Sequence, residues 1–231
     1  MDQGIKITRI DTGASNVYLI IQGSSSIIVD TGRKGSRDRI LKEARKNGVE
    51  PKDINAIFLT HTHYDHTGSL HALKKATGAD VIVHEAEARF IRDGFSPLPK
   101  GTILPTKIIS SLAHGPLRKV GKFDPAEPDL TFKKEMDLSN HGIDGRIIHV
   151  PGHSEGSSIL LLKDGSCIVG DTMFNIFPRS SYPPFADDED LLMRTWENIK
   201  EMRITRFYSG HGKPFERDKF LRSFEKRRRK R

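Results

Sequence analysis

Short runs of β-branched and other apolar residues alternate along the chain with polar, Gly-containing turns, and this pattern predicts strands. We expect strands at residues 17–21, 27–29, 54–59, 81–83, 146–150, 158–162, 167–169 and 206–208. Apolar residues that recur every three or four positions predict helices at about residues 36–47 and 187–202, along the segment with Leu70, Leu73 and Ala76, and at the C-terminus around Phe220, Leu221 and Phe224. The chain is therefore expected to contain strands and helices in mixed order.

This periodicity disappears between about residues 94 and 130, a stretch that holds six of the 12 prolines. An ordinary connection is much shorter, and irregular segments of this length commonly form lids or binding loops. We interpret the stretch as an ordered, partly helical insertion near the functional site. The rest of residues 1–231 is then expected to form a single domain, which suits a chain of this length.

Metal-type side chains follow the ends of several predicted strands, in loops that contain or border glycine. The segment from His61 to His66 packs three imidazoles and one carboxylate into six positions, and residues two apart in an extended turn point the same way. His61 and His63 can therefore chelate one ion together, while Asp65 and His66 face a second position. Strand ends at one edge of a sheet form a rigid frame, so residues far apart in sequence can meet there.

Seven such residues recur in this pattern, and neutral imidazole and carboxylate are the side chains that bind a divalent metal such as zinc. They are His61, His63, Asp65, His66, His153, Asp171 and His211. Seven ligands are too many for one tetrahedral ion, but they suit two ions that share a bridging carboxylate. We expect His153 to complete a site with His61 and His63, and Asp171 to bridge both ions. The sequence therefore predicts metal-assisted hydrolysis.

The formal net charge of +8 comes largely from the last segment, residues 226–231, which carries six positive charges. Without this tail the charge falls to about +2, so the body of the chain is nearly neutral. A terminal basic run is typical of a solvated tail and, less often, of a nucleic-acid or membrane-surface patch. It is weak support for nucleic acid as a partner beside a small-molecule substrate.

The single Cys167 cannot form an intramolecular disulfide, which suits a reducing compartment. No apolar run approaches the roughly 18 residues of a membrane span, and the first residues lack the apolar stretch of a secretory signal. We therefore expect a cytoplasmic protein without a membrane segment. The pattern makes no prediction about its oligomeric state.

The motifs THTHYDHTG, PGHS, GDT and SGHG, in this order, resemble the signature of the metallo-β-lactamase-fold hydrolase superfamily. The early VDTG segment, which contains Asp30, also resembles a motif of that family. The resemblance spans about residues 5 to 215. It implies an α/β fold, a four-layer αββα sandwich in which two mixed sheets face each other with helices outside and the metals at one edge.

Asp171 at the bridging position resembles the glyoxalase II-like and lactonase-like branches of the family. Zinc β-lactamases with a cysteine ligand place that cysteine in the same role, whereas Cys167 stands four residues earlier within a predicted strand and is expected to be a small core residue. The diiron, flavin-linked branch typically has Glu where this chain has His63. The branch within the family stays open.

We therefore predict a dinuclear, zinc-dependent hydrolase, with iron or manganese as alternative metals. A metal-bridging hydroxide would attack a small ester, thioester, lactone or related substrate. Asp65 is the expected catalytic residue, since it would orient the hydroxide and carry a proton to the leaving group. Two rivals remain open: a mononuclear iron dioxygenase acting on a thiol or persulfide, and a metal-dependent nuclease favoured by the basic tail.

Residues near the metal motifs are candidates for substrate binding, although each also has a structural interpretation. They are His84, Phe174, Phe177, Arg179 and Tyr182. Arg179 could pair with an anionic group of the substrate, and the aromatic residues could equally belong to the core. Asp30 could support a metal ligand through a hydrogen bond or could simply cap a turn.

Overall fold

The computed structural model describes residues 4–114 and 121–229. Their strands form two six-stranded sheets, and each sheet contains both parallel and antiparallel pairs. The first sheet contains, in spatial order, β1 (Lys6–Asp11), β2 (Asn16–Gln22), β3 (Ser25–Val29), β4 (Ile54–Phe58), β5 (Asp80–His84) and β6 (Leu130–Phe132). The second contains β12 (Phe215–Glu216), β11 (Arg206–Ser209), β10 (Ser166–Gly170), β9 (Ser158–Leu162), β8 (Gly145–His149) and β7 (Glu135–Asp137).

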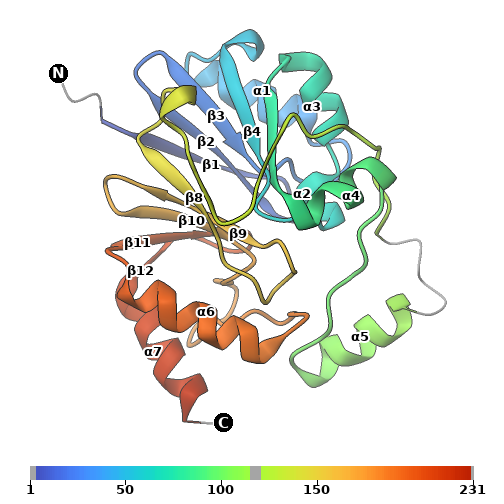
Figure 1. The fold of residues 1–231 in the computed structure, drawn as a ribbon, viewed down its shortest axis with the longest axis vertical. Helices are drawn as coiled ribbons and strands as arrows, with labels where there is room; N and C mark the ends of the chain where they lie inside the picture. Colours follow the sequence, from blue (N-terminus) through green and yellow to red (C-terminus); the bar gives the residue numbers. More distant parts are fainter. Residues whose placement is uncertain (1–3, 115–120, 230–231) are drawn as a thin grey trace.

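The helices lie outside the pair of sheets (Figure 1). On the side of the first sheet are α1 (Arg37–Lys46), α3 (Leu70–Thr77) and α4 (Glu85–Asp93), and on the side of the second are α6 (Glu189–Glu201) and α7 (Arg217–Arg228). The short helix α2 (Tyr64–Thr67) lies between them, and α5 (Leu104–His114) stands apart from the sheets. Single 3-10 turns occur at η1 (Pro51–Asp53) and η3 (Ser139–His141).

Three apolar clusters separate these layers, because successive side chains of a strand point to opposite faces. In β2, Val17 and Leu19 pack outward against α1 and α3, whereas Tyr18 and Ile20 pack inward against the second sheet. On the far side, Trp196 of α6 belongs to the cluster that covers the outer face of the second sheet. The predicted αββα sandwich with two mixed sheets is therefore confirmed.

The long predicted strands and helices are present with shifts of one or two residues at their ends. The hydrophobic pattern missed β1, the short edge strands β6, β7 and β12, and helix α4. Edge strands expose one side of the ladder and need few apolar residues, so their pattern is weak. Cys167 is completely buried in β10, as expected of a core residue.

The Pro-rich segment contains α5 and has two isolated bridges. Phe95 pairs with Lys122 within the segment, and Gly101 pairs with Phe185, which fastens the segment to the body. Thr102 also donates its backbone N–H to the Pro184 carbonyl at 2.9 Å. The basic run begins as the last turn of α7, while residues 230–231 lie outside the described residues. Among the described helices, none combines the length and apolarity that a membrane span requires.

The two sheets are joined by hydrogen bonds at the edge where the predicted metal ligands lie. Ser158 of the second sheet donates its N–H to the Thr60 carbonyl beyond β4, at 2.9 Å. Asn16 of β2 donates its side-chain amide to the carbonyls of Ser209 at 2.9 Å and Gly212 at 2.7 Å. Asn16 therefore ties the first sheet to the loop that carries His211.

Substituting Asn16→Ala should lower the free energy of unfolding by about 1–3 kcal/mol, because the buried Ser209 carbonyl and the partly buried Gly212 carbonyl lose this side-chain donor. Urea denaturation measures this change, with an unchanged denaturant slope. Asn140→Ala, at an exposed position, is the control and should change stability by less than about 0.5 kcal/mol. Equal stabilities of the two variants would contradict this role of Asn16.

Candidate metal centre

All seven predicted ligands follow strands whose ends meet at one edge of the sandwich. His61 and His63 lie between β4 and α2, and α2 itself carries Asp65 and His66 on its single turn. His153 follows β8, Asp171 comes directly after β10, and His211 comes two residues after β11. Because β10 and β11 are parallel neighbours, their carboxyl ends place Asp171 and His211 side by side.

The side chains form two groups of possible metal ligands. The first donor group contains His61, His63, His153 and Asp171, and the second donor group contains Asp65, His66 and His211. Within each group the ligand atoms lie within 4.8 Å of one another.

Asp171 lies between the two donor groups. Its Oδ2 is 3.8 Å from Nε2 of His61 and 3.7 Å from Nε2 of His153. The same carboxylate contacts the second donor group, with 3.3 Å from Oδ1 to Nε2 of His66 and 3.3 Å from Oδ2 to Nε2 of His211. Asp171 therefore has the position of a carboxylate that two ions could share.

Both donor groups contain buried polar atoms that have no hydrogen-bond partner and that a metal ion could bind. Nε2 of His61, Nε2 of His66 and Oδ1 of Asp171 are buried without any hydrogen-bond partner, which is costly for polar atoms. Ligand atoms bound tetrahedrally to zinc lie roughly 3.4 Å from one another. In the first donor group, Nε2 of His153 and Nδ1 of His63 are 3.1 Å apart, and Oδ2 of Asp171 is 3.7 to 3.8 Å from Nε2 of His153 and His61, which is close to these dimensions.

Hydrogen bonds at the opposite ring nitrogens hold several imidazoles in place. Nδ1 of His61 contacts the Thr60 hydroxyl at 3.0 Å, and Nδ1 of His66 contacts Oδ2 of Asp30 at 2.8 Å. Nδ1 of His153 contacts the Phe185 carbonyl at 3.0 Å. Partners of this kind orient metal-binding histidines and leave Nε2 free for the metal.

Asp30 connects two of the ligands through its buried carboxylate. In addition to His66, it accepts hydrogen bonds from the Thr60 N–H at 2.8 Å and from the Thr60 hydroxyl. It has a φ of 61°, a left-handed conformation that is rare outside glycine, and is the only non-glycine residue with a positive φ in the described part of the chain. The sequence allows two roles for Asp30, support of a ligand and capping of a turn. The structure shows the supporting hydrogen bond, to His66.

Glu87 of α4 is a supporting residue that sequence reasoning missed. Its buried carboxylate accepts hydrogen bonds from the Thr62 N–H at 3.1 Å and from the Thr62 hydroxyl, between His61 and His63. It also accepts from the Ser154 hydroxyl at 2.6 Å and the Gly156 N–H at 3.0 Å, next to His153. Glu87 thus joins the two loops that supply the imidazoles of the first donor group. A glutamate at a helix start gave no sequence signal for this contact.

The ionisation states in the first donor group suit metal binding. Burial, together with the nearby His66 and His63, holds the pKa of His61 well below its ordinary value. Burial and the nearby His153 lower the pKa of His63 to about 3. Burial alone would raise the pKa of Asp171, but His211 and His66 hold it well below its usual range. The imidazoles of His61 and His63 are therefore neutral and the Asp171 carboxylate is ionised near neutral pH, as ligands must be.

The second donor group attracts positive charge. Burial would lower the pKa of His211, but the Asp171 and Asp65 carboxylates raise it to about 9. Burial would also lower the pKa of His66, yet Asp171 and Asp30 raise it well above its ordinary value. A group that favours positive charge so strongly within a buried setting suits a divalent cation.

Two glycines allow the loops to approach this closely. A Cβ on Gly210 would lie 2.2 Å from Oδ1 of Asp171, and one on Gly68 would lie 2.3 Å from the backbone nitrogen of Lys34. The backbone therefore packs closely behind the His-rich loop at Gly68. Any larger residue at either position would displace a ligand loop.

A cavity of about 380 Å³ opens onto the ligands. Its other walls are mostly apolar and come largely from the Pro-rich segment and from the chain after β10. They include Pro97, Leu98, Pro99, Ile109, Phe174 and Phe185. No lysine or arginine is found among the described residues that line it. The insertion therefore covers the metal centre with apolar side chains.

Of the predicted substrate residues, only Phe174 lines this metal-centre cavity, where its ring stacks on His211 at a centroid distance of 4.4 Å. Phe177 and Tyr182 line a different cavity. Arg179 is exposed and does not line either cavity. His84 caps α4, contacts the Lys133 carbonyl and stacks on His149. The loop after β10 turns away from the metals after Phe174, which explains why the residues beyond it do not reach the ligands.

Several known proteins resemble this chain over most of its length. A probable metallo-hydrolase of Methanocaldococcus jannaschii is 29% identical over 206 residues, 86% of this chain and 88% of that protein. The acyl-coenzyme A thioesterase MBLAC2 of Bos taurus is 22% identical, over 90% of this chain and 76% of its own length. A hydroxyacylglutathione hydrolase of Anaeromyxobacter dehalogenans is 28% identical over 68% of this chain and 45% of that protein.

The fold is also similar to solved structures. A metallo-beta-lactamase family protein from Thermus thermophilus superposes with a TM-score of 0.71 at 20% identity, covering 98% of this chain and 79% of that chain. The model of the metallo-beta-lactamase superfamily matches residues 10–211, which include both donor groups. With the sheets, the ligand order and this match in agreement, the chain belongs to the metallo-β-lactamase superfamily.

Proposed function

We propose that this metal-dependent hydrolase binds two divalent ions, one at each donor group, with Asp171 shared between them. The observation that carries the proposal is the contact of the Asp171 carboxylate with imidazoles of both groups, at 3.3 to 3.8 Å. The donors are nitrogen and carboxylate oxygen, a set that suits zinc.

Ions bound at these groups would polarise the scissile carbonyl and lower the pKa of a water molecule. Asp65 is the proposed catalytic residue, because its carboxylate lines the metal-centre cavity and stays ionised. Burial would raise its pKa, but His66 and His211 lower it below the ordinary value. The carboxylate can accept the proton released by the attacking water and return it to the leaving group.

We propose thioesters or esters with a small apolar acyl group as the substrate class. The lining of the metal-centre cavity supports this choice, since Leu98, Ile109 and Phe185 exclude water and contact apolar groups. Both a hydroxyacylglutathione hydrolase and an acyl-coenzyme A thioesterase are among the similar proteins, and each name describes a thioester substrate.

The two rival functions receive less support from the same site. A mononuclear oxygenase would leave Asp65, His66 and His211 without a metal, although these side chains are gathered around one point. A nuclease needs cations along its binding surface for the phosphates, and the described lining of the metal-centre cavity contains none.

Metal analysis tests the dinuclear proposal. Protein stripped with a chelator and reloaded with zinc should contain about two ions per chain and regain thioester hydrolysis. His211→Ala should retain close to one ion, because the four residues of the first donor group remain, whereas Asp171→Ala should weaken both sites. One iron per chain with oxygen uptake and no hydrolysis would refute the proposal in favour of an oxygenase. Full hydrolytic activity of the stripped protein would refute metal dependence itself.

The apolar wall is tested by Ile109→Ser. Loss of this contact should raise KM for a hexanoyl thioester about 3- to 10-fold without changing the metal content. Leu112→Ser provides the matched control, since Leu112 lies on the same helix with similar exposure but does not line the metal-centre cavity. Equal KM values for the two variants would contradict the proposed position of the acyl group.

The support given by Glu87 is tested by Glu87→Gln. The amide NH2 group of glutamine is a hydrogen-bond donor, so it cannot accept the hydrogen bonds that one carboxylate oxygen of Glu87 accepts. The ligand loops should therefore loosen, and metal affinity should fall about 10- to 100-fold. Competition with a chromogenic chelator measures the affinity. Glu85→Gln, an exposed change on the same helix, should leave it unchanged. A metal affinity of Glu87→Gln equal to that of the unmodified protein would show that Glu87 does not position these ligands.

A further inference from the structure

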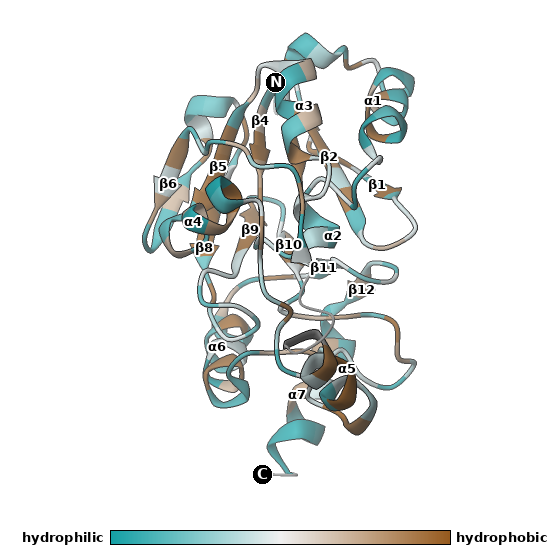
Figure 2. Ribbon diagram, turned by 90° about the vertical axis from the view of Figure 1, so that its right-hand side faces the viewer, coloured by the Kyte–Doolittle hydropathy of each residue, from teal (hydrophilic) through white to brown (hydrophobic). Residues whose placement is uncertain are grey.

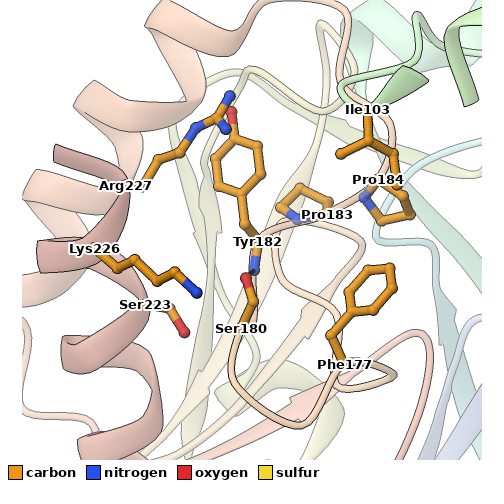
Figure 3. A pocket seen from close by; sticks show the side chains of 9 residues that line it. All are labelled: Ile103, Phe177, Ser180, Tyr182, Pro183, Pro184, Ser223, Lys226 and Arg227. Atoms are coloured by element: carbon orange, nitrogen blue, oxygen red, sulfur yellow. Dashed lines mark hydrogen bonds between the residues drawn. The ribbon is translucent and has the colours of Figure 1, made fainter. Parts of the chain in front are cut away.

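A second cavity, of about 240 Å³, lies beside the C-terminal end of α7 (Figure 3). We name it the α7 cavity. It is separate from the metal-centre cavity, because no described residue lines both. The Gly101–Phe185 bridge marks the boundary: Ile103 and Pro184 face the α7 cavity, while Phe185 faces the metals.

One side of the α7 cavity is apolar and incompletely covered. Ile103, Phe177, Pro183 and Pro184 form this side, and Ile103 and Phe177 remain 40% and 37% exposed. All large hydrophobic side chains that are exposed in the described chain lie in only two segments, residues 103–112 and 176–177. Helix α5, which carries most of them, is coloured as hydrophobic in Figure 2. An apolar ligand placed here would remove the exposed surface of Ile103 and Phe177 from water.

The other side of the α7 cavity is polar and positively charged. In Figure 3 the Lys226 side chain extends from α7 toward Ser180, whose hydroxyl lies beside the Tyr182 backbone nitrogen, and Ile103 and Phe177 lie farther from α7. The Ser180 oxygen accepts the Tyr182 N–H at 3.1 Å, so its hydroxyl hydrogen is available to a further acceptor.

The positive charge at this end is not neutralised by the chain. The neighbouring Arg227 pairs with Glu189 through one terminal nitrogen, and Arg228 pairs with Glu225, while Nε of Arg227 is buried without a hydrogen-bond partner. Lys226 has no carboxylate partner among the described residues, and no Asp or Glu is among the described residues that line the α7 cavity. An anion at this end would therefore meet one cation without a carboxylate partner and one hydroxyl donor.

We propose that the α7 cavity binds a small amphiphilic carboxylate. Its two oxygen atoms accept hydrogen bonds from the Lys226 ammonium and the Ser180 hydroxyl, and its aliphatic or aryl part packs against Ile103, Phe177 and Pro184. A single cation and a single hydroxyl match a monoanion better than a phosphate, which is usually held by several donors. The site goes beyond the proposed hydrolase function and shares none of its residues.

The fluorescence of Trp196 can report whether a ligand occupies the α7 cavity. Tyr182 lines the α7 cavity, and its ring contacts Trp196 at a centroid distance of 5.4 Å. Trp196 is the only tryptophan in the sequence, so its fluorescence reports on this neighbourhood alone. A ligand against Tyr182 is expected to change that signal.

Titration of the metal-loaded protein with butanoate, hexanoate and octanoate tests the proposal, followed by fluorescence and by calorimetry. Each added methylene should tighten binding about fourfold until the α7 cavity is full. Lys226→Gln should weaken octanoate binding about tenfold or more, and octanol should bind both proteins equally. Phe177→Ser should weaken octanoate by several-fold. Arg222→Gln, an exposed change on the same helix, is the control and should have no effect.

Three results would overturn the proposal. Octanoate that binds Lys226→Gln as tightly as the unmodified protein would show that the ammonium group is not its partner. Octanoate displaced by a thioester substrate and insensitive to Phe177→Ser would be bound at the metals instead. Sedimentation that shows a dimer, with Phe177→Ser dissociating it and no octanoate bound, would show that Ile103 and Phe177 are covered by a second copy of the chain.

Discussion

A buried carboxylate surrounded by imidazoles is the constraint on which this structure depends. Asp171 is 5% exposed, and an isolated ionised carboxylate in such a position would cost many kcal/mol. It remains ionised because His211 and His66, both within 3.3 Å of the carboxylate, hold its pKa well below the usual range. Those side chains come from both sheets, so the charge can be accommodated only when the whole sandwich is assembled.

Two further buried carboxylates also need hydrogen-bond donors to be stable inside the protein. Asp30 and Glu87 are each 1% exposed, and each is stabilised by N–H and hydroxyl donors of the ligand loops. Their hydrogen bonds also fix the side chains that flank the ligands. The left-handed conformation of Asp30 is a local strain that persists because Thr60 and His66 both bind its carboxylate. The contacts that stabilise these buried charges are therefore also the contacts that orient the predicted ligands.

The sequence indicated which residues would gather at the site, because metal-type side chains at strand ends are chemically distinctive. The parallel neighbours β10 and β11 place Asp171 beside His211, whereas His61 meets Asp171 only because the two sheets pack together. The αββα layers were implied by the resemblance to the family, and the alternation of β2 agrees with them. Glu87 could not be found in this way, because its partners lie 25 and 67 positions away and a glutamate in an exposed helix looks the same.

The walls of the metal-centre cavity were hardest to predict. The aromatic residues after Asp171 were expected to form one wall, but a turn after Phe174 sends Phe177 and Tyr182 into another cavity. Turns of this kind depend on contacts such as the Gly101–Phe185 bridge, which joins two irregular segments. Hydrophobic periodicity carries no information about such pairings.

The predicted ligands and the other walls of the metal-centre cavity are held by different parts of the chain. The ligands are held by strand ends and buried charges, which leave little freedom for change without loss of the metal site. The other walls of the metal-centre cavity are formed instead by the Pro-rich segment and the chain after β10, where Phe174 stacks on His211 and the Phe185 carbonyl contacts His153. Substitution or altered length in these segments can reshape the wall while the donor groups stay intact. A fold of this kind hosts different reactions, so the proposed substrate class depends on the 96–109 and 174–185 segments rather than on the donor groups.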